Sequence, residues 1–419
     1  MHRLLGSTRV GVNEAMLSSF GSRSAAFACG SKMHRRLLGA SARAVAPREL
    51  LFTPGPLSTS AGVKESMLFD FGSRDAKFVS MVRDVRAGIL DIAGVSAATH
   101  TAVLVQGSGT MCNESVIGSA VPREGGKLLV MANGAYGVRL GKIATTCGIE
   151  TVVHETLEDA VPPLAAATAL LDEAAAEGAP FTTMAIVHHE TTSGILNPVQ
   201  EISLAAKARG CTTILDAMSS FGAIPIDLEA CGIDFLVTSA NKCIEGVPGF
   251  AIAVATHDAI AQCRGIAPRS LGLDLVSQLD GLEGDGQFRF TPPVQVLAAF
   301  HTALAEYNAK GGLPAQAARY QENQRIFIEG CEGMGLVPFV QGPERSYIIT
   351  SIRYPENANF DFSIFYAKLA ERGFVIYPGK VTEAECFRVG HIGHIFPDDT
   401  RALIGAMRDV FGEMQIALP

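Results

Sequence analysis

The sequence lacks the features by which several large classes of protein are recognised. Its 419 residues contain no apolar run approaching the roughly 18–20 residues that span a bilayer, so we expect no membrane segment. The net charge is −8, and no stripe of Lys and Arg with interleaved aromatic residues is present. Nucleic acid is therefore not an expected partner.

Cysteine is present but scattered. No two of the nine cysteines form a C-x-x-C pair, and their number is odd. We therefore expect a reducing compartment rather than a disulfide framework, and no spacing supports a zinc or other metal site. The cysteines are Cys29, Cys112, Cys147, Cys211, Cys231, Cys243, Cys263, Cys331 and Cys386.

Residues 1–48 differ in composition from the rest of the chain. They are rich in Arg, Ser and Ala, contain a single acidic residue, Glu14, and have no long apolar stretch. This composition is typical of an organelle transit peptide, although a disordered extension has a similar one. We predict a mitochondrial location, with the plastid and the cytoplasm as alternatives.

From Glu49 onward, short apolar segments alternate with helical patterns, which predicts an α/β fold with a mainly parallel central sheet covered by helices on both faces. The pattern changes near residues 291–293, after which we expect a smaller α+β domain. The predicted domains are therefore 49–295 and 296–419. The strands expected in the first are Thr101–Val105, Lys127–Met131, Thr183–Val187, Thr213–Leu215, Asp234–Thr238 and Phe250–Val254.

The turn at residues 106–110 lies where such a sheet binds ligands, beyond the carboxyl end of a strand. Its glycines and hydroxyl groups, at the start of a helix, suit an anion such as phosphate. The turn lacks the Lys-Ser/Thr ending of a nucleoside-triphosphate loop and the G-x-G-x-x-G pattern. A tight turn that binds nothing has the same composition, so the turn alone predicts little.

Two chemically active residues also follow predicted strands. Asp216 ends one strand, where a carboxylate needs a cation or hydrogen-bond donors, or else caps a helix. Lys242 follows the next strand, where apolar surroundings would lower its pKa and make its amine a nucleophile, although most lysines are surface groups. An anion-binding turn, a carboxylate and a lysine together suit pyridoxal phosphate (PLP), which has a phosphate, a pyridine nitrogen and an aldehyde.

Five segments carry a resemblance to a known family. They are Leu51–Pro56, Gln106–Gly109, His189–Gly194, Asp216–Gly222 and Ser239–Phe250. They resemble the class V aminotransferases of fold type I, and within that group the 2-aminoethylphosphonate–pyruvate transaminases. The similarity runs from about Glu49 to the C-terminus, and the Asn-Lys-Cys-Ile-Glu-Gly-Val-Pro-Gly-Phe run is its most specific part.

The resemblance implies PLP as the cofactor and roles for individual residues. Lys242 matches the lysine that binds PLP as a Schiff base, and Asp216 matches the partner of the pyridine nitrogen. Met111 occupies the position expected to cover the ring face, and Thr192 matches the residue near the ring hydroxyl. Thr291 matches a residue that reaches the phosphate in the neighbouring subunit, which implies a homodimer with shared sites. The remaining implied contacts to PLP are Ser108, Gly109, Thr110, Ser239 and Asn241.

The resemblance also implies a reaction, the transfer of an amino group from 2-aminoethylphosphonate to pyruvate, giving phosphonoacetaldehyde and alanine. Arg388 matches the arginine that clamps the substrate carboxylate, and Gly55 is implied in the same substrate site. An aminotransferase of the alanine–glyoxylate or serine–pyruvate type is the first alternative. A PLP lyase or desulfurase that uses the Cys243 thiol, or a non-catalytic homologue, are the others.

Overall fold

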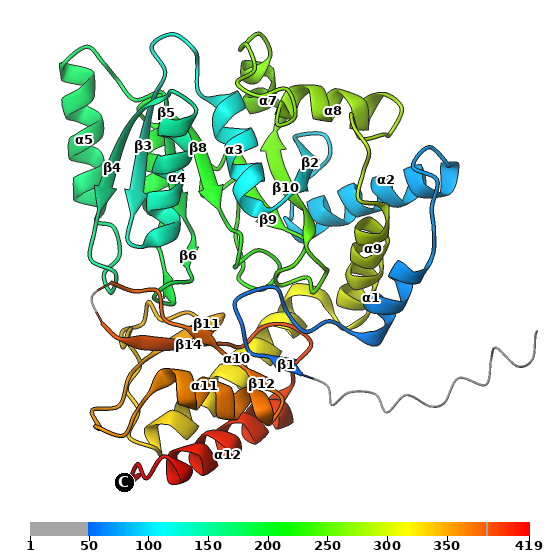
Figure 1. The fold of residues 1–419 in the computed structure, drawn as a ribbon. Helices are drawn as coiled ribbons and strands as arrows, with labels where there is room; N and C mark the ends of the chain where they lie inside the picture. Colours follow the sequence, from blue (N-terminus) through cyan, green and yellow to red (C-terminus); the bar gives the residue numbers. More distant parts are fainter. Residues whose placement is uncertain (1–48, 383) are drawn as a thin grey trace, which may run out of the picture. The chain divides into compact units, whose positions relative to one another are not determined.

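A seven-stranded sheet is the centre of the computed structural model, which describes residues 49–382 and 384–419 (Figure 1). The strand order is β2-β10-β9-β8-β5-β3-β4; β10 is antiparallel to both of its neighbours, and the remaining pairs are parallel. The predicted mainly parallel α/β sheet is therefore confirmed. The strands are β2 (His100–Gly107), β3 (Lys127–Ala132), β4 (Glu150–Glu155), β5 (Thr183–Val187), β8 (Thr212–Asp216), β9 (Phe235–Ser239) and β10 (Gly249–Thr256).

Helices connect these strands, and α3 and α4 cross the face of the sheet that is turned toward the viewer in Figure 1. Among the described residues, no helix is long and apolar enough to cross a membrane. The helices are α1 (Ala61–Glu65), η1 (Ser66–Leu68), α2 (Ala76–Ile92), α3 (Gly109–Ala120), α4 (Ala135–Thr146), α5 (Leu164–Ala176), α6 (Val199–Lys207), α7 (His257–Cys263), α8 (Leu275–Gly284) and α9 (Val294–Ala309).

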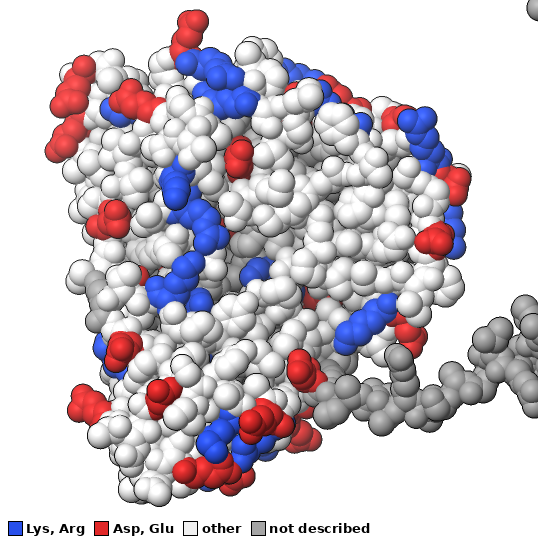
Figure 2. Space-filling view, in the orientation of Figure 1, with Lys and Arg blue, Asp and Glu red and all other residues white. Residues whose placement is uncertain are grey.

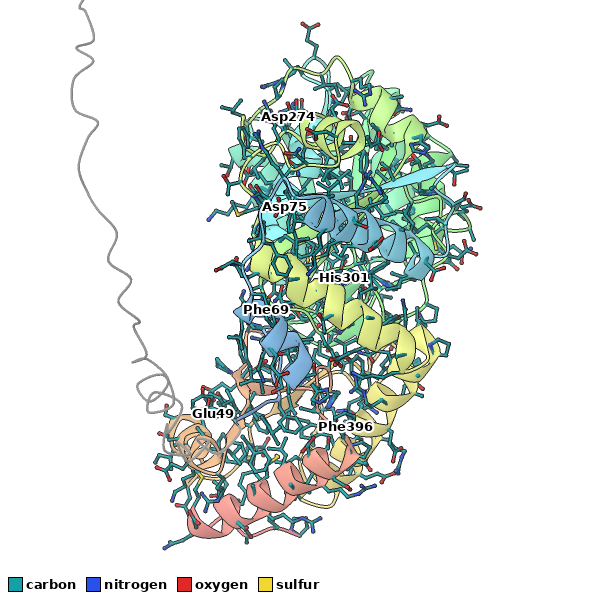
Figure 3. The ribbon with its side chains drawn as sticks, turned by 90° about the vertical axis from the view of Figure 1, so that its right-hand side faces the viewer. Glu49, Phe69, Asp75, Asp274, His301 and Phe396 are labelled. Atoms are coloured by element: carbon teal, nitrogen blue, oxygen red, sulfur yellow. The ribbon has the colours of Figure 1, made fainter. Side chains whose placement is uncertain are left out.

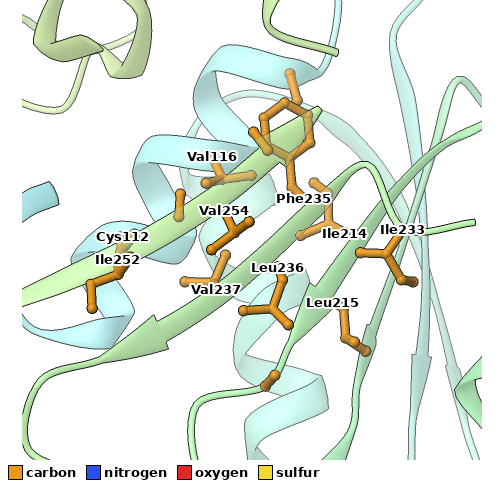
Figure 4. Packing of buried hydrophobic residues seen from close by; sticks show 14 of the residues in the cluster. Cys112, Val116, Ile214, Leu215, Ile233, Phe235, Leu236, Val237, Ile252 and Val254 are labelled. Atoms are coloured by element: carbon orange, nitrogen blue, oxygen red, sulfur yellow. The ribbon is translucent and has the colours of Figure 1, made fainter. Parts of the chain in front are cut away.

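The main hydrophobic core lies between this sheet and its helices. Figure 4 shows Cys112 and Val116 of α3 lying over Val237, Ile252 and Val254 of the central strands. The central strands β5 and β9 are buried at every position, as expected for strands covered on both faces. Burying one large apolar side chain stabilises the fold by roughly 1.5–3 kcal/mol. The buried strands therefore fix the positions of the residues that follow their carboxyl ends.

A second core forms around a three-stranded antiparallel sheet nearer the C-terminus, ordered β11-β14-β13. The N-terminal strand β1 pairs with β12 beside this core, and β6 pairs with β7 in a short hairpin. These elements are β1 (Leu50–Leu51), β6 (His189–Glu190), β7 (Ile195–Leu196), α10 (Gly312–Glu332), β11 (Ile349–Arg353), α11 (Phe362–Glu371), β12 (Phe374–Val375), β13 (Tyr377–Pro378), β14 (Cys386–Gly390) and α12 (Pro397–Glu413).

The position of α9 bears on the predicted domain boundary at residues 295/296, which stays a prediction. Side chains of α9, including Leu297 and Phe300, are part of the main core. Figure 3 shows Phe69, at the end of η1, close to α9, which carries His301. A boundary between α9 and α10 therefore agrees better with the two cores.

Phe300 offers a test of the core that supports the sheet. It is fully buried, and its ring meets that of Phe250 edge to face with centroids 5.2 Å apart. Phe300→Ala should lower the free energy of unfolding by about 3–5 kcal/mol, because it removes buried contacts and leaves a cavity. The matched control, Leu271→Ala at a side chain that is 72% exposed, should change it by no more than about 0.5 kcal/mol in denaturant titrations. Equal effects would contradict this account of the core.

Candidate active site

The amine of Lys242 lies at the carboxyl edge of the large sheet, three residues after β9 ends. Its Nζ donates a hydrogen bond to the carbonyl oxygen of Pro54 at 2.6 Å. Gly55 lies directly against it with φ of +120°, and a Cβ at Gly55 would come within 2.7 Å of Nζ. Glycine is therefore required there by both the backbone and the space that the lysine occupies.

Burial lowers the pKa of Lys242 to about 8, and the positive charge of Arg388 contributes to the decrease. Cys243 and Asp216 act in the opposite direction but do not offset the loss of hydration. A substantial fraction of the amine is thus neutral near pH 8, and a neutral amine is a nucleophile. Because the unfolded state keeps this proton up to a pKa of 10.5, the lysine's contribution to the free energy of unfolding rises between about pH 8 and 10.5.

Asp216 ends the adjacent strand β8, and its carboxylate is buried. Asn113 Nδ2 donates to Oδ2 at 2.7 Å, and the backbone N–H of Met218 donates to Oδ1 at 2.9 Å. Burial nevertheless raises the pKa of Asp216, with these hydrogen bonds and the Lys242 charge opposing the increase. A cation bound against the carboxylate would stabilise its ionised form.

A cavity of about 190 Å³ opens between Lys242, Asp216 and the N-terminus of α3. The structure brings most of the predicted residues to it from separate strand ends. The lining residues are Ser108, Gly109, Thr110, Asn113, Tyr136, Arg139, Leu140, Val187, His189, Thr191, Asp216, Met218, Ser219, Ser239, Asn241 and Lys242.

Three of the predicted cofactor contacts do not line this cavity. Met111 is 43% exposed and lies against Gly107, outside the cavity lining. Thr192 is buried with its hydroxyl donating to Glu190 at 2.7 Å, and the preceding residue, Thr191, lines the cavity instead. Thr291 is exposed, and its carbonyl oxygen accepts a hydrogen bond from Gln106. The structure therefore places Met111 and Thr192 outside the cavity lining, and their contacts to the cofactor stay predictions.

Tyr136 is the main residue that the sequence interpretation missed. It follows β3 within the first turn of α4 and lines the cavity. The buried carboxylate of Glu190 accepts hydrogen bonds from the backbone N–H groups of Tyr136 and Gly137, at 3.0 and 3.2 Å, and so holds the start of α4. An aromatic residue shortly after a predicted strand was a usable signal, since the other site residues also follow strands.

His189 lines the cavity and carries a buried polar atom without a partner in the described part of the chain. Its Nδ1 lies 2.8 Å from the hydroxyl of Ser219, whereas its buried Nε2 has no hydrogen-bond partner among the described residues. Burial lowers the pKa of His189 to about 3, so the ring is neutral. A buried polar atom without a partner is rare in a finished interior and suits a polar group of a ligand.

Arg388 lies on β14, beside the cavity rather than in its lining. Its side chain is buried, with Nε donating to the Pro378 carbonyl at 3.0 Å and Nη1 donating to the Thr191 carbonyl at 3.1 Å. Burial lowers the pKa of Arg388, and electrostatic interaction with Tyr136 opposes the decrease. Because two carbonyls orient it and no carboxylate of the described residues pairs with it, the guanidinium is prepared for an anion.

Other reactive groups do not converge here. Within residues 49–382 and 384–419, no group of three or more His, Cys, Asp or Glu is placed to hold a metal ion. The Cys243 thiol is buried and donates to the Ser219 carbonyl at 3.1 Å. Burial raises its pKa to about 12, so the thiol stays protonated.

Comparisons with known proteins determine the family. The model of the family described as aminotransferase class V matches residues 58–379. The chain belongs to the class V aminotransferases. Like these enzymes it depends on PLP, and the donors around the cavity fit that cofactor: a helix N-terminus for the phosphate, a buried carboxylate for the ring nitrogen and a lysine amine for the aldehyde.

Individual relatives of this aminotransferase are similar over nearly their whole length. A 2-aminoethylphosphonate–pyruvate transaminase from Vibrio vulnificus is 45% identical over 361 residues, covering 85% of this chain and 96% of the relative. One from Bacillus mycoides is 44% identical over 359 residues, with coverages of 85% and 96%. These relatives are bacterial, and this finding contradicts the predicted mitochondrial location. The predicted transit peptide itself falls in residues 1–48, outside the described residues.

Solved structures confirm the fold type. An alanine–glyoxylate aminotransferase from Nostoc sp. superposes with a TM-score of 0.80 at 24% identity, covering 87% of this chain and 96% of the other. A ureidoglycine–glyoxylate aminotransferase from Bacillus subtilis also gives 0.80, at 19% identity, with coverages of 89% and 95%. At these identities the likeness shows the fold alone.

The rate at which PLP attaches to the apoprotein tests the state of Lys242. Because only the neutral amine attacks the aldehyde, the rate should increase with pH through about 8 and then level off. Stopped-flow absorbance of apoprotein mixed with PLP measures it, with Lys242→Ala as the control that should not react. If the rate still rises as the pH approaches 10.5, the ordinary pKa of a lysine, the pKa of Lys242 is not lowered as described.

Proposed function

We propose that this class V aminotransferase transfers the amino group of 2-aminoethylphosphonate to pyruvate, producing phosphonoacetaldehyde and L-alanine. The observation that carries the proposal is the identity of 43–45% to transaminases named for this reaction, over about 85% of the chain. Lys242 and Asp216 line one cavity, and Arg388 interacts electrostatically with Lys242 from beside it, which supports the proposal. The chemistry that bound PLP supplies is an electron sink and a carrier for the amino group.

We assign the cofactor contacts to the chain's own groups as follows. Lys242 is the covalent anchor, and its Nζ also carries the proton removed from the substrate carbon. Asp216 keeps the ring nitrogen protonated, and Tyr136 covers the ring face in place of Met111. Thr191, rather than Thr192, lies near the ring hydroxyl. The remaining contacts come from Ser108, Gly109 and Thr110, which hold the phosphate at the start of α3, and from Ser239 and Asn241 in the cavity wall.

Arg388 binds the carboxylate of pyruvate or alanine, and Gly55 keeps the backbone close to Lys242 on the substrate side. The guanidinium is held by the carbonyls of Thr191 and Pro378, so it offers its remaining N–H groups without reorganising. A desulfurase reaction through Cys243 is not supported, because its thiol is protonated and bonded to the Ser219 carbonyl.

We also propose that two copies of the chain share their active sites. Thr291 is exposed next to Phe290, which is 46% exposed, and Gln106 of the phosphate turn donates to the Thr291 carbonyl. Exposed apolar side chains beside a functional turn are typical of a surface that a partner covers. In a two-fold dimer, such a segment can contribute to the site of the other copy.

A donor screen tests the proposed reaction. PLP-loaded enzyme is mixed separately with 2-aminoethylphosphonate, alanine, serine and cysteine, and the visible spectrum of the cofactor is followed. We expect 2-aminoethylphosphonate and alanine to convert the cofactor to its amine form, because one is the donor and the other is the product of the second half-reaction. Conversion by serine but not by 2-aminoethylphosphonate would favour the serine–pyruvate alternative.

Arg388→Ala should separate substrate binding from cofactor binding. We expect the second-order rate constant of the pyruvate half-reaction to fall about 30-fold or more, since losing a buried charge partner costs roughly 2–5 kcal/mol. PLP loading should be unchanged, because Arg388 does not line the cofactor cavity. Single-turnover spectra and cofactor titration measure the two quantities. An equal loss of both would assign Arg388 a structural role instead.

A further inference from the structure

Two cationic side chains lie over the ring of Tyr136, and a third, that of Arg388, interacts with Tyr136 electrostatically. The guanidinium carbon of Arg139 lies 4.7 Å from the ring centroid, and Nζ of Lys380 lies 5.0 Å from it. Arg139 comes from α4, Lys380 from the segment after β13 and Arg388 from β14, so the fold brings them together from separate elements.

No carboxylate of the described residues forms an ion pair with any of the three. The nearby carboxylate of Glu190 already accepts hydrogen bonds from Tyr136, Gly137 and Thr192. Partial burial lowers the pKa of Lys380, and the charges of Arg139 and Arg388 lower it further. Figure 2 shows Lys and Arg side chains gathered around a hollow on this face of the molecule. Such a group of cations favours an anionic ligand.

The two proposed substrates place their anionic groups differently. In pyruvate and alanine, the carboxylate is bonded directly to the carbon that exchanges the amino group. In 2-aminoethylphosphonate, one more carbon lies between that carbon and the phosphonate, which also carries up to two negative charges. A site that serves both half-reactions therefore needs cations at two distances from Lys242. Arg388 interacts electrostatically with Lys242 and suits the nearer position.

We propose that Lys380, together with Arg139, forms a second anion position that binds the phosphonate of the amino donor. This inference rests on the proposed function and deepens it, because it names the residues that distinguish a phosphonate from a carboxylate. Lys380 is the main determinant. Its ammonium is a compact charge on a flexible stem that can follow a tetrahedral dianion, whereas Arg388 is fixed by two carbonyls.

Equilibrium binding of two unreactive probes tests the proposal with the PLP-loaded enzyme. Ethylphosphonate is the donor without its amine, and propionate has the same carbon chain with a carboxylate. Isothermal titration should show that Lys380→Met weakens ethylphosphonate binding about tenfold, as for the loss of one charge-assisted contact, while propionate binding changes much less. Lys380→Arg should recover most of the affinity. Lys142→Met is the control for net charge, because it removes an exposed lysine that lies one turn after Arg139 on α4. It should change the binding of neither ethylphosphonate nor propionate.

The same variants are compared in the two half-reactions. With Lys380→Met, the second-order rate constant for 2-aminoethylphosphonate should fall about as much as ethylphosphonate binding, and that for pyruvate should not. Equal weakening of both probes, no weakening, or a loss confined to PLP affinity would each overturn the proposal. If the wild-type enzyme does not react with 2-aminoethylphosphonate, the proposed function fails. The probe titrations still decide independently whether Lys380 binds a phosphonate.

Discussion

The burial of the Lys242 amine is the constraint on which the rest of the site depends. An ammonium group loses its hydration there, and a single hydrogen bond to the carbonyl of Pro54 replaces it only in part. The cost is reflected in a pKa lowered to about 8, and that lowered pKa provides a reactive amine near neutral pH. Gly55 must lack a side chain for the amine to fit, so the segment after β1 that contains Gly55 and the loop after β9 that contains Lys242 depend on each other.

The sheet accounts for the remaining groups. Strands β3, β5, β8 and β9 are parallel neighbours, so the residues that follow them converge at one edge. Tyr136, Thr191, Asp216 and Lys242 all reach the cavity in this way. The edge carries both signs of charge: the buried Asp216 carboxylate deep in the cavity, and the cations around Tyr136 beside it. This separation suits a cofactor with a cationic ring nitrogen and substrates with anionic ends.

Much of this arrangement could be predicted from the sequence, because buried parallel strands are short, continuous apolar runs. The prediction of β5 was correct to the residue, and those of β3, β8 and β10 were short by a few residues at their ends. Strand β4 was missed because it is at the sheet edge and its partly exposed residues include Glu and His. Post-strand position identified Asp216 and Lys242. The family resemblance pointed to Thr192, and the sequence could not show that the neighbouring Thr191 lines the cavity, because that depends on the backbone of the turn between β6 and β7. Asn113 carries no local signal at all; only the fold brings it to Asp216.

The central claim is that Lys242 is the covalent anchor for PLP, and borohydride reduction tests it most directly. Reduction of the PLP-loaded enzyme, followed by proteolysis and mass spectrometry, should place a phosphopyridoxyl label on Lys242, and the visible absorbance of the enzyme should disappear at the same time. Lys242→Ala should remain unlabelled under the same conditions. A label on any other lysine of the wild-type enzyme would contradict the account.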